Sequence, residues 1–369
     1  MRILFLLRIL LLLCALSPTW AQDRPILVGA AFSQTGALAA LAADYGKALA
    51  LWQDEVNAAG GLLGRRVELK LYDDASDAAR AGRFYAQLIR EDKADLLIGP
   101  YGSAATLLAG AEAERAQRIL INGAGPSRAV HKRSPRYVFQ SALPHSSYGI
   151  GPLELARSAG HRTVFILARD DPASREMAEA ARDAAPRLGL KPGELKIYSG
   201  GSSDFTPLIL EAAASGAEAW LAFGELRDTA DIVRSSKKLG YAPKFFYARA
   251  ASDPKLITLV GQDAELALGT KEYDPKFKTP GNDKFAAAFA AKWSAPPGLA
   301  AAQGYAAASV LAEAVRRAGT LDQAKLRATL AALETPTVLG GYKVDPQNGE
   351  QTAAKPPVVQ ILKGRPELV

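Results

Sequence analysis

Cysteine is almost absent from this sequence of 369 residues. The single cysteine, Cys14, lies in an apolar segment at the N-terminus. Residues 22–369 therefore contain no thiol, which excludes disulfide bonds, cysteine–metal sites and cysteine nucleophiles from that part of the chain. A chain without cysteines is also suited to export, because it needs no oxidase to pair them.

Histidine is scarce as well, and the three histidines, His131, His145 and His161, stand on separate predicted loops. The motifs HExxH, GxSxG, the P-loop and the dinucleotide-binding GxGxxG do not occur in the contexts that they require. The sequence thus offers no base–nucleophile pair and no cluster of metal ligands. We expect a protein that is not an enzyme and that uses no cofactor and no metal.

A long block of charge of one sign is also lacking. The formal net charge is +7, but the basic residues are spread along the chain. This distribution argues against nucleic acid as a partner. The mild positive excess is compatible with anionic ligands.

The apolar segment at the N-terminus is short for a membrane span and is interrupted by an arginine. Residues 1–21 end in Thr-Trp-Ala, which resembles a small-x-small cleavage site, so we interpret them as a secretory signal peptide cut near Ala21. Cleavage would remove two arginines and no acidic residue, and the net charge would fall from +7 to +5. The alternative is a lipoprotein anchor at Cys14, although Leu13 is bulky where a lipobox requires a small residue.

The remaining chain is longer than one hydrophobic core usually organises, so we expect two lobes. Apolar or alternating runs followed by helical stretches occur in two series, which is typical of consecutive βαβ units. The predicted strands span residues 26–30, 67–72, 96–98 and 119–121 in the first series, and 164–168, 195–198, 219–223 and 245–248 in the second. Each series predicts a mostly parallel sheet flanked by helices, and the loop Pro144-His145-Ser146 forms a natural crossover.

Residues 94–130 carry the strongest functional signal. The predicted strand 96–98 ends in a Gly-Pro loop, and Ser103 then opens an alanine-rich helix. The strand 119–121 ends in a second loop, 122–127, at the same carboxyl edge of the sheet, where doubly wound folds bind ligands. The start of the helix offers unpaired N–H groups that can hold a carboxylate or phosphate. The alternative is that Ser103 only caps its helix.

An ordered set of motifs resembles the type I periplasmic binding proteins of the leucine/isoleucine/valine-binding family. Asn57-Ala-Ala-Gly-Gly-Leu-Leu-Gly64 before a strand and Asp73-Asp74 resembles one motif of that family, and Ile98-Gly99-Pro100 with Ser103 and Thr106 resembles its carboxylate-binding turn. Further matches, in the same order as in the family, are Ser203-Asp204-Phe205 and Leu239-Gly240.

The resemblance implies a type I periplasmic-binding-protein fold, α/β, in which three crossovers join two lobes around a ligand cleft. It implies lobe 1 from 22–142 and 274–343, and lobe 2 from 143–273 and 344–369. Such proteins reside in the periplasm and deliver a small solute to a membrane ABC permease, and we expect a monomer. A periplasmic sensor of the same fold is the alternative role.

The same resemblance nominates ligand-binding residues in the first lobe and at its crossover. It implies that Ser103 binds a carboxylate and that Tyr148 closes over the ligand. Further candidates are Thr106, Gly125 and Ser127, for which helix or turn roles are equally compatible with the sequence. Tyr101 and Phe32 are candidates for an aromatic wall of the pocket, although aromatic residues near strand ends more often serve simple packing.

The second lobe departs from the family pattern. Amino-acid binders of the family usually place an acid after the strand equivalent to 245–248, whereas this chain has Arg249. The loop after 219–223 carries Glu225, where the family often has an aromatic residue. If Arg249 faces the cleft, it attracts a carboxylate and repels an ammonium group. We therefore slightly favour an aromatic or other organic acid over a branched-chain amino acid, with a solvated or mutual charge pair as the alternative role of both residues.

Overall fold

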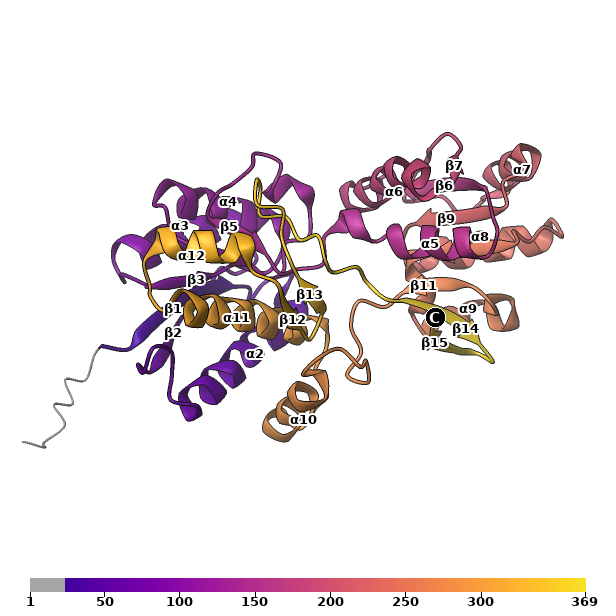
Figure 1. Ribbon diagram of the computed structural model, residues 1–369. Helices are drawn as coiled ribbons and strands as arrows, with labels where there is room; N and C mark the ends of the chain where they lie inside the picture. Colours follow the sequence, from indigo (N-terminus) through magenta and orange to yellow (C-terminus); the bar gives the residue numbers. More distant parts are fainter. Residues whose placement is uncertain (1–23) are drawn as a thin grey trace, which may run out of the picture.

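The structure of this protein, a computed structural model, describes residues 24–369. The expected signal peptide and the alternative anchor at Cys14 lie outside the described residues. Figure 1 shows two α/β lobes side by side, with several connecting segments between them. The expected fold class is confirmed.

The first lobe contains a sheet of five parallel strands in the order β2-β1-β3-β4-β5. Its central strands are short and fully buried, as expected for apolar triplets in a parallel sheet that is covered on both faces. The strands are β1 (Ile26–Phe32), β2 (Val67–Asp73), β3 (Leu96–Ile98), β4 (Leu120–Asn122) and β5 (Val138–Gln140).

Helices cover both faces of this sheet. One face packs against α2 (Ala39–Ala58), α11 (Leu299–Ala318) and α12 (Gln323–Ala332). The other face packs against α3 (Ala78–Arg90) and α4 (Ser103–Arg115), and α10 (Asn282–Trp293) contacts α2. The golden α11 and α12 in Figure 1 lie among indigo and purple elements, because the chain returns to the first lobe after building most of the second.

The second lobe contains a sheet in the order β15-β14-β11-β10-β9-β6-β7, and β8 pairs with β6. All neighbours are parallel except at β14 and β15, which run antiparallel. The strands are β6 (Thr163–Arg169), β7 (Lys191–Pro192), β8 (Lys196–Tyr198), β9 (Ala219–Phe223), β10 (Phe245–Ala248), β11 (Leu268–Thr270), β14 (Val358–Leu362) and β15 (Arg365–Leu368).

The second sheet is likewise buried on both faces. One core contains side chains of α5 (Ile150–Ser158) and α6 (Pro172–Ala184). The other contains side chains of α7 (Thr206–Ser215), α8 (Leu226–Lys238) and α9 (Lys255–Val260). Each sheet therefore has its own cores on its two faces, which agrees with the expectation of two lobes for a chain of this length.

Three connections join the lobes, at residues 141–149, 271–281 and 343–357. The first contains the predicted crossover at Pro144-His145-Ser146, and the third follows the hairpin of β12 (Thr335–Thr337) and β13 (Gly340–Tyr342). The first and third connections contact each other, since the Ser146 hydroxyl donates a 3.0 Å hydrogen bond to Glu350. The residue limits of the two lobes stay a prediction.

Candidate functional site

The two strand-end loops of the first lobe lie side by side. The Gly102 N–H donates a 3.0 Å hydrogen bond to the carbonyl of Ala124, and Tyr101 forms a parallel bridge with the same residue. Where β3 and β4 end, the Gly99 N–H also donates a 2.8 Å hydrogen bond to the Ile121 carbonyl. The expected meeting of the two loops at the carboxyl edge is therefore present.

Ser103 is the first residue of α4, and Gly102 with φ of 92° is the N-cap residue in its place. The Ser103 side chain makes no capping bond to its own helix. Its Oγ instead accepts a 3.1 Å hydrogen bond from the Ser127 N–H, in the second loop. Within residues 24–369, the N–H groups of Ser103, Ala104 and Ala105 have no carbonyl partner, as expected for the first turn of a helix.

Thr106 and Gly125 shape the loops from inside. The Thr106 hydroxyl is buried and donates to the Gly102 carbonyl at 2.8 Å. The Gly125 N–H donates to Asn122 Oδ1, and the Gly125 carbonyl accepts from Asn122 Nδ2, both at 2.8 Å. A Cβ atom at Gly125 would lie 2.6 Å from Thr106 Oγ1, so glycine is required there for close packing. Thr106 and Gly125 thus both have hydrogen-bond partners within the first lobe.

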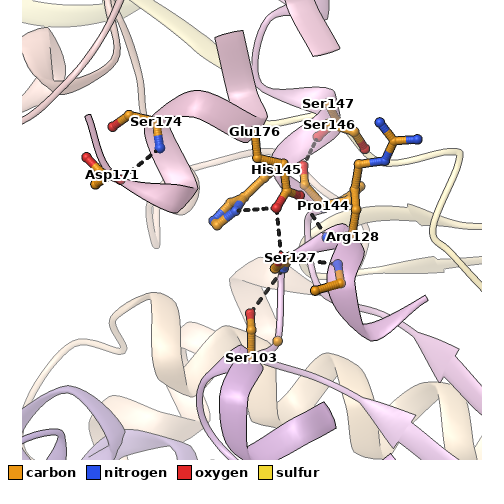
Figure 2. A network of polar contacts seen from close by, with 12 residues as sticks. Ser103, Ser127, Arg128, Pro144, His145, Ser146, Ser147, Asp171, Ser174 and Glu176 are labelled. Atoms are coloured by element: carbon orange, nitrogen blue, oxygen red, sulfur yellow. Dashed lines mark hydrogen bonds and ion pairs between the residues drawn. The ribbon is translucent and has the colours of Figure 1, made fainter. Parts of the chain in front are cut away.

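The hydroxyl of Ser127 already makes hydrogen bonds to both lobes. It donates a 2.7 Å hydrogen bond to Glu176 Oε2 on α6 of the second lobe, and accepts from the Ala129 N–H at 3.2 Å. Figure 2 shows Ser127 between Ser103 below and Glu176 above. Glu176 was not among the residues that the sequence nominated.

The predicted aromatic wall divides into two parts. Phe32 is buried at the end of β1, with its ring centroid 6.0 Å from that of Tyr45. Tyr101 is only partly buried and packs edge-on against Tyr45 at 6.3 Å. Phe32 thus packs in the core of the first lobe, and Tyr101 lies at its rim.

Tyr148 is buried near the end of the first connection, and its hydroxyl donates a 3.3 Å hydrogen bond to Glu272 Oε1. Burial, together with the charge of Glu272, raises the pKa of Tyr148 well above its ordinary range. Burial and Glu272 also raise the pKa of Tyr101 in the first lobe. Glu272 therefore contacts Tyr148 in the first connection, and its charge also acts on Tyr101 of the first lobe. It comes two residues after β11, at the carboxyl edge of the second sheet, which is the one signal by which the sequence could have found it.

Arg249 and Glu225 form an ion pair with 3.0 Å between Nη2 and Oε1. The Arg249 side chain is 23% exposed and the Glu225 side chain 56% exposed. Arg249 Nε is buried without a hydrogen-bond partner in the described part of the chain. The mutual charge pair, which the sequence left open as an alternative, is what the structure contains.

Other features of the described residues do not point to a different site. Residues 24–369 contain no group of three or more His, Cys, Asp or Glu side chains placed to hold a metal ion. A surface cavity of about 520 Å³ lies at the amino edge of the second sheet, where Phe245 and Leu268 begin their strands. None of the nominated residues lines it. Across the described region, we find no helix with the length and apolar character needed to cross a membrane.

Comparison with known proteins identifies the family. The family described as periplasmic binding protein matches residues 25–365, so the chain belongs to it. Its members are solute-binding proteins of the periplasm. A relative from Pseudomonas aeruginosa, named amino acid binding protein, is 27% identical over 324 residues, which are 87% of this chain and 86% of that protein.

Solved structures share the same fold. A protein from Rhodospirillum rubrum, provisionally described as a branched-chain amino acid ABC transporter, has a TM-score of 0.84 and 23% identity, and the match covers 94% of this chain and all of that one. A solute-binding protein of an ABC transporter from Rhodopseudomonas palustris BisB5, in complex with 3,4-dihydroxybenzoic acid, has a TM-score of 0.69 and 20% identity, with 94% and 96% covered. The expected resemblance to the leucine/isoleucine/valine-binding family is confirmed.

Proposed function

We propose that this protein is the solute-binding component of an ABC importer and that it binds a small carboxylate-bearing ligand between its two lobes. The observation that carries the proposal is the position of Ser103 at the start of α4, at the carboxyl edge of the first sheet. Free N–H groups and the helix dipole favour an anion at this point.

The hydroxyl of Ser103 is arranged to donate a hydrogen bond. Its oxygen already accepts the Ser127 N–H, and among the described residues its proton has no acceptor. A ligand carboxylate could therefore accept from the hydroxyl and from the N–H groups of Ser103 and Ala104. Charge-assisted hydrogen bonds of this kind are shorter and stronger than neutral ones.

The second lobe supports an amino group on the ligand. Glu272 makes no ion pair within the described residues, it accepts a hydrogen bond from Tyr148, and burial together with its charge raises the pKa of Tyr101. A carboxylate without a cationic partner would attract an ammonium group. Arg249 was the reason to favour a non-amino acid, and its charge is offset by Glu225. We therefore place an amino acid first, with Glu272 holding its ammonium group.

An aromatic carboxylate is the second candidate. It is supported by the buried, unpartnered Nε of Arg249, and by the structural relative from R. palustris that is in complex with 3,4-dihydroxybenzoic acid. A guanidinium that keeps one free donor can still hold an oxygen of an acidic or hydroxylated ring.

Delivery to a permease requires a change in shape that signals occupancy. Three connections between the lobes allow bending, and a ligand that contacts both lobes favours their approach. Small-angle scattering should therefore show a smaller radius of gyration with saturating ligand. No compaction, with binding established independently, would argue for a rigid pocket in one lobe.

The direct experiment is a thermal-shift screen of L-leucine, L-valine, other amino acids, and benzoate-type acids. A ligand that binds only the folded state raises the melting temperature by mass action. We expect a rise with at least one carboxylate-bearing compound and none with its amide. If no carboxylate stabilised the protein while uncharged solutes did, the proposal would fail.

A further inference from the structure

A carboxylate of the second lobe reaches the first lobe. Glu176 lies in the first half of α6, and its side chain is 17% exposed. Its Oε2 accepts a 2.7 Å hydrogen bond from the Ser127 hydroxyl, and its Oε1 accepts one of 2.7 Å from the Arg128 N–H. Figure 2 shows the Glu176 side chain directed toward this loop. One side chain thus holds two consecutive residues of the opposite lobe.

The helix that carries Glu176 is fixed within its own lobe. Asp171 accepts from the Ser174 N–H at 2.9 Å, and Pro172 begins the helix. Met177 and Ala181 are buried in the core of the second lobe. The Glu176 carboxylate therefore follows the position of the second lobe as a whole.

Ser127 links Glu176 to Ser103 through two hydrogen bonds. The single hydroxyl proton of Ser127 is used on Glu176, so Ser127 has none left for a ligand. Its N–H is directed at Ser103 Oγ, at 3.1 Å. The chain of contacts is therefore Glu176 to Ser127 to Ser103, and only the Ser103 proton at its end is free among the described residues.

The surroundings of Glu176 favour its charged form. Burial alone would raise the pKa of this carboxyl, but the nearby His145 and the hydrogen bonds from Arg128 and Ser127 outweigh burial and lower the pKa. The ring Nδ1 of His145 lies 3.8 Å from Glu176 Oε2, beyond hydrogen-bond range. The backbone N–H of His145 donates a 3.0 Å hydrogen bond to the Pro126 carbonyl. The first connection between the lobes thus meets the same loop.

We propose that Glu176 is a positioning residue that holds Ser127, and through it the hydroxyl of Ser103, in the arrangement that binds a ligand carboxylate. The inference rests on the proposed function, because it takes Ser103 as the carboxylate donor. It adds a coupling between the lobes. A movement that withdraws α6 releases Ser127, and the carboxylate site of the first lobe then loses its fixed geometry.

One test needs no ligand. Amide hydrogen exchange of the Ser127 N–H reports its bond to Ser103, and Glu176 does not contact that N–H. We expect about tenfold faster exchange at Ser127 in Glu176→Ala, as for the loss of a bond worth about 1.4 kcal/mol. Glu179→Ala is the matched control, since it removes the same charge from an exposed position of the same helix. Its exchange at Ser127 should equal that of the wild type.

The second test measures affinity for L-leucine and for 3,4-dihydroxybenzoate by calorimetry. Glu176→Ala should bind the better of the two probes about tenfold more weakly, and Glu179→Ala should bind it as the wild type does. Glu176→Gln keeps one acceptor oxygen and should recover part of the loss. This partial rescue also covers the case in which Glu176→Ala does not fold.

Unchanged exchange at Ser127 in both Glu176 variants would overturn the proposal. Unchanged affinity in both, with clear binding by the wild type, would also overturn it and leave Glu176 as a contact between the lobes only. If the wild type bound neither probe, the proposed function would be in question, and the exchange measurement would still decide the role of Glu176.

Discussion

The guanidinium of Arg249 donates a hydrogen bond of 3.0 Å from Nη2 to the carboxylate of Glu225. Both residues follow strands of the second sheet, β10 and β9, which are neighbours in that sheet. The pair therefore sits at the carboxyl edge, and its net charge is zero. Because of this pairing, Arg249 by itself does not decide whether the ligand carries an ammonium group.

The first prediction concerns this pair. Arg249→Ala should change affinity for L-leucine by less than about threefold, because a largely exposed partner already offsets the guanidinium. For 3,4-dihydroxybenzoate as the true ligand, the same change would break a contact worth about 2–5 kcal/mol. Calorimetry with both compounds separates the two cases. A large loss of leucine affinity would show that the pair opens on binding.

The second prediction concerns Glu272. Glu272→Gln removes the negative charge and keeps an acceptor for Tyr148, so it should weaken binding of an amino acid by tenfold or more, about 1.4 kcal/mol. Binding of a carboxylate that has no amino group should change little, which makes that compound the internal control. Equal losses for both ligands would mean that Glu272 supports Tyr148 and does not contact an ammonium group.

The third prediction concerns Gly125, where a Cβ atom would lie 2.6 Å from Thr106 Oγ1 and 2.9 Å from Asn122 Oδ1. Gly125→Ala should lower the free energy of unfolding by about 1–3 kcal/mol, as overpacking does. Gly201→Ala is the control, since no atom lies within 4 Å of its added Cβ. Chemical denaturation measures both. A Gly125→Ala variant as stable as the control would show that the two loops can separate at little cost.

The fourth prediction is a pH dependence of stability from Asp73. A hydrogen bond from the Thr35 hydroxyl is the largest cause that lowers the pKa of Asp73 from 3.8 to about 2. Burial opposes it, and further bonds from the Ala75, Thr35 and Gln34 N–H groups outweigh burial. Because the folded value lies below the unfolded one, these bonds stabilise the fold above pH 3.8 and cease to do so as the pH falls to about 2.

Asp73→Asn tests this directly. The substitution should lower the free energy of unfolding by about 1 kcal/mol at neutral pH, a modest effect because solvent screens this partly exposed carboxylate. The difference in unfolding free energy from the wild type should vanish near pH 2. Denaturation curves over that range measure the difference. A cost that stayed constant down to pH 2 would rule out the ionised carboxylate as its source.

Much of the fold is predictable because its strands are short apolar runs between turn residues. The predicted bounds 96–98, 219–223 and 245–248 coincide with β3, β9 and β10. The strands β14 and β15 are not predicted, since no βαβ pattern precedes this antiparallel pair and β15 is short, polar and largely exposed. Their place in the second sheet depends on the third connection, a contact between segments far apart in sequence.

The site is predictable only where its residues come after strands that the pattern predicts. Ser103 follows β3 through a short loop and Arg249 directly follows β10, so the sequence nominates both. Glu272 follows β11, which is not among the predicted strands, and Glu176 lies inside a helix, where a glutamate usually faces solvent. Their partners, Tyr148 and Ser127, are 124 and 49 residues away, so only the tertiary structure brings these pairs together.

The central claim is that Ser103 binds the carboxylate of a small ligand, and calorimetry on Ser103→Ala tests it most directly. The wild type and the variant should be titrated with the compound that gives the largest thermal shift, after unfolding curves establish that both are equally folded. Loss of one charge-assisted hydrogen bond costs about 1.5–3 kcal/mol, so affinity should fall tenfold or more. An unchanged dissociation constant in Ser103→Ala would contradict the account.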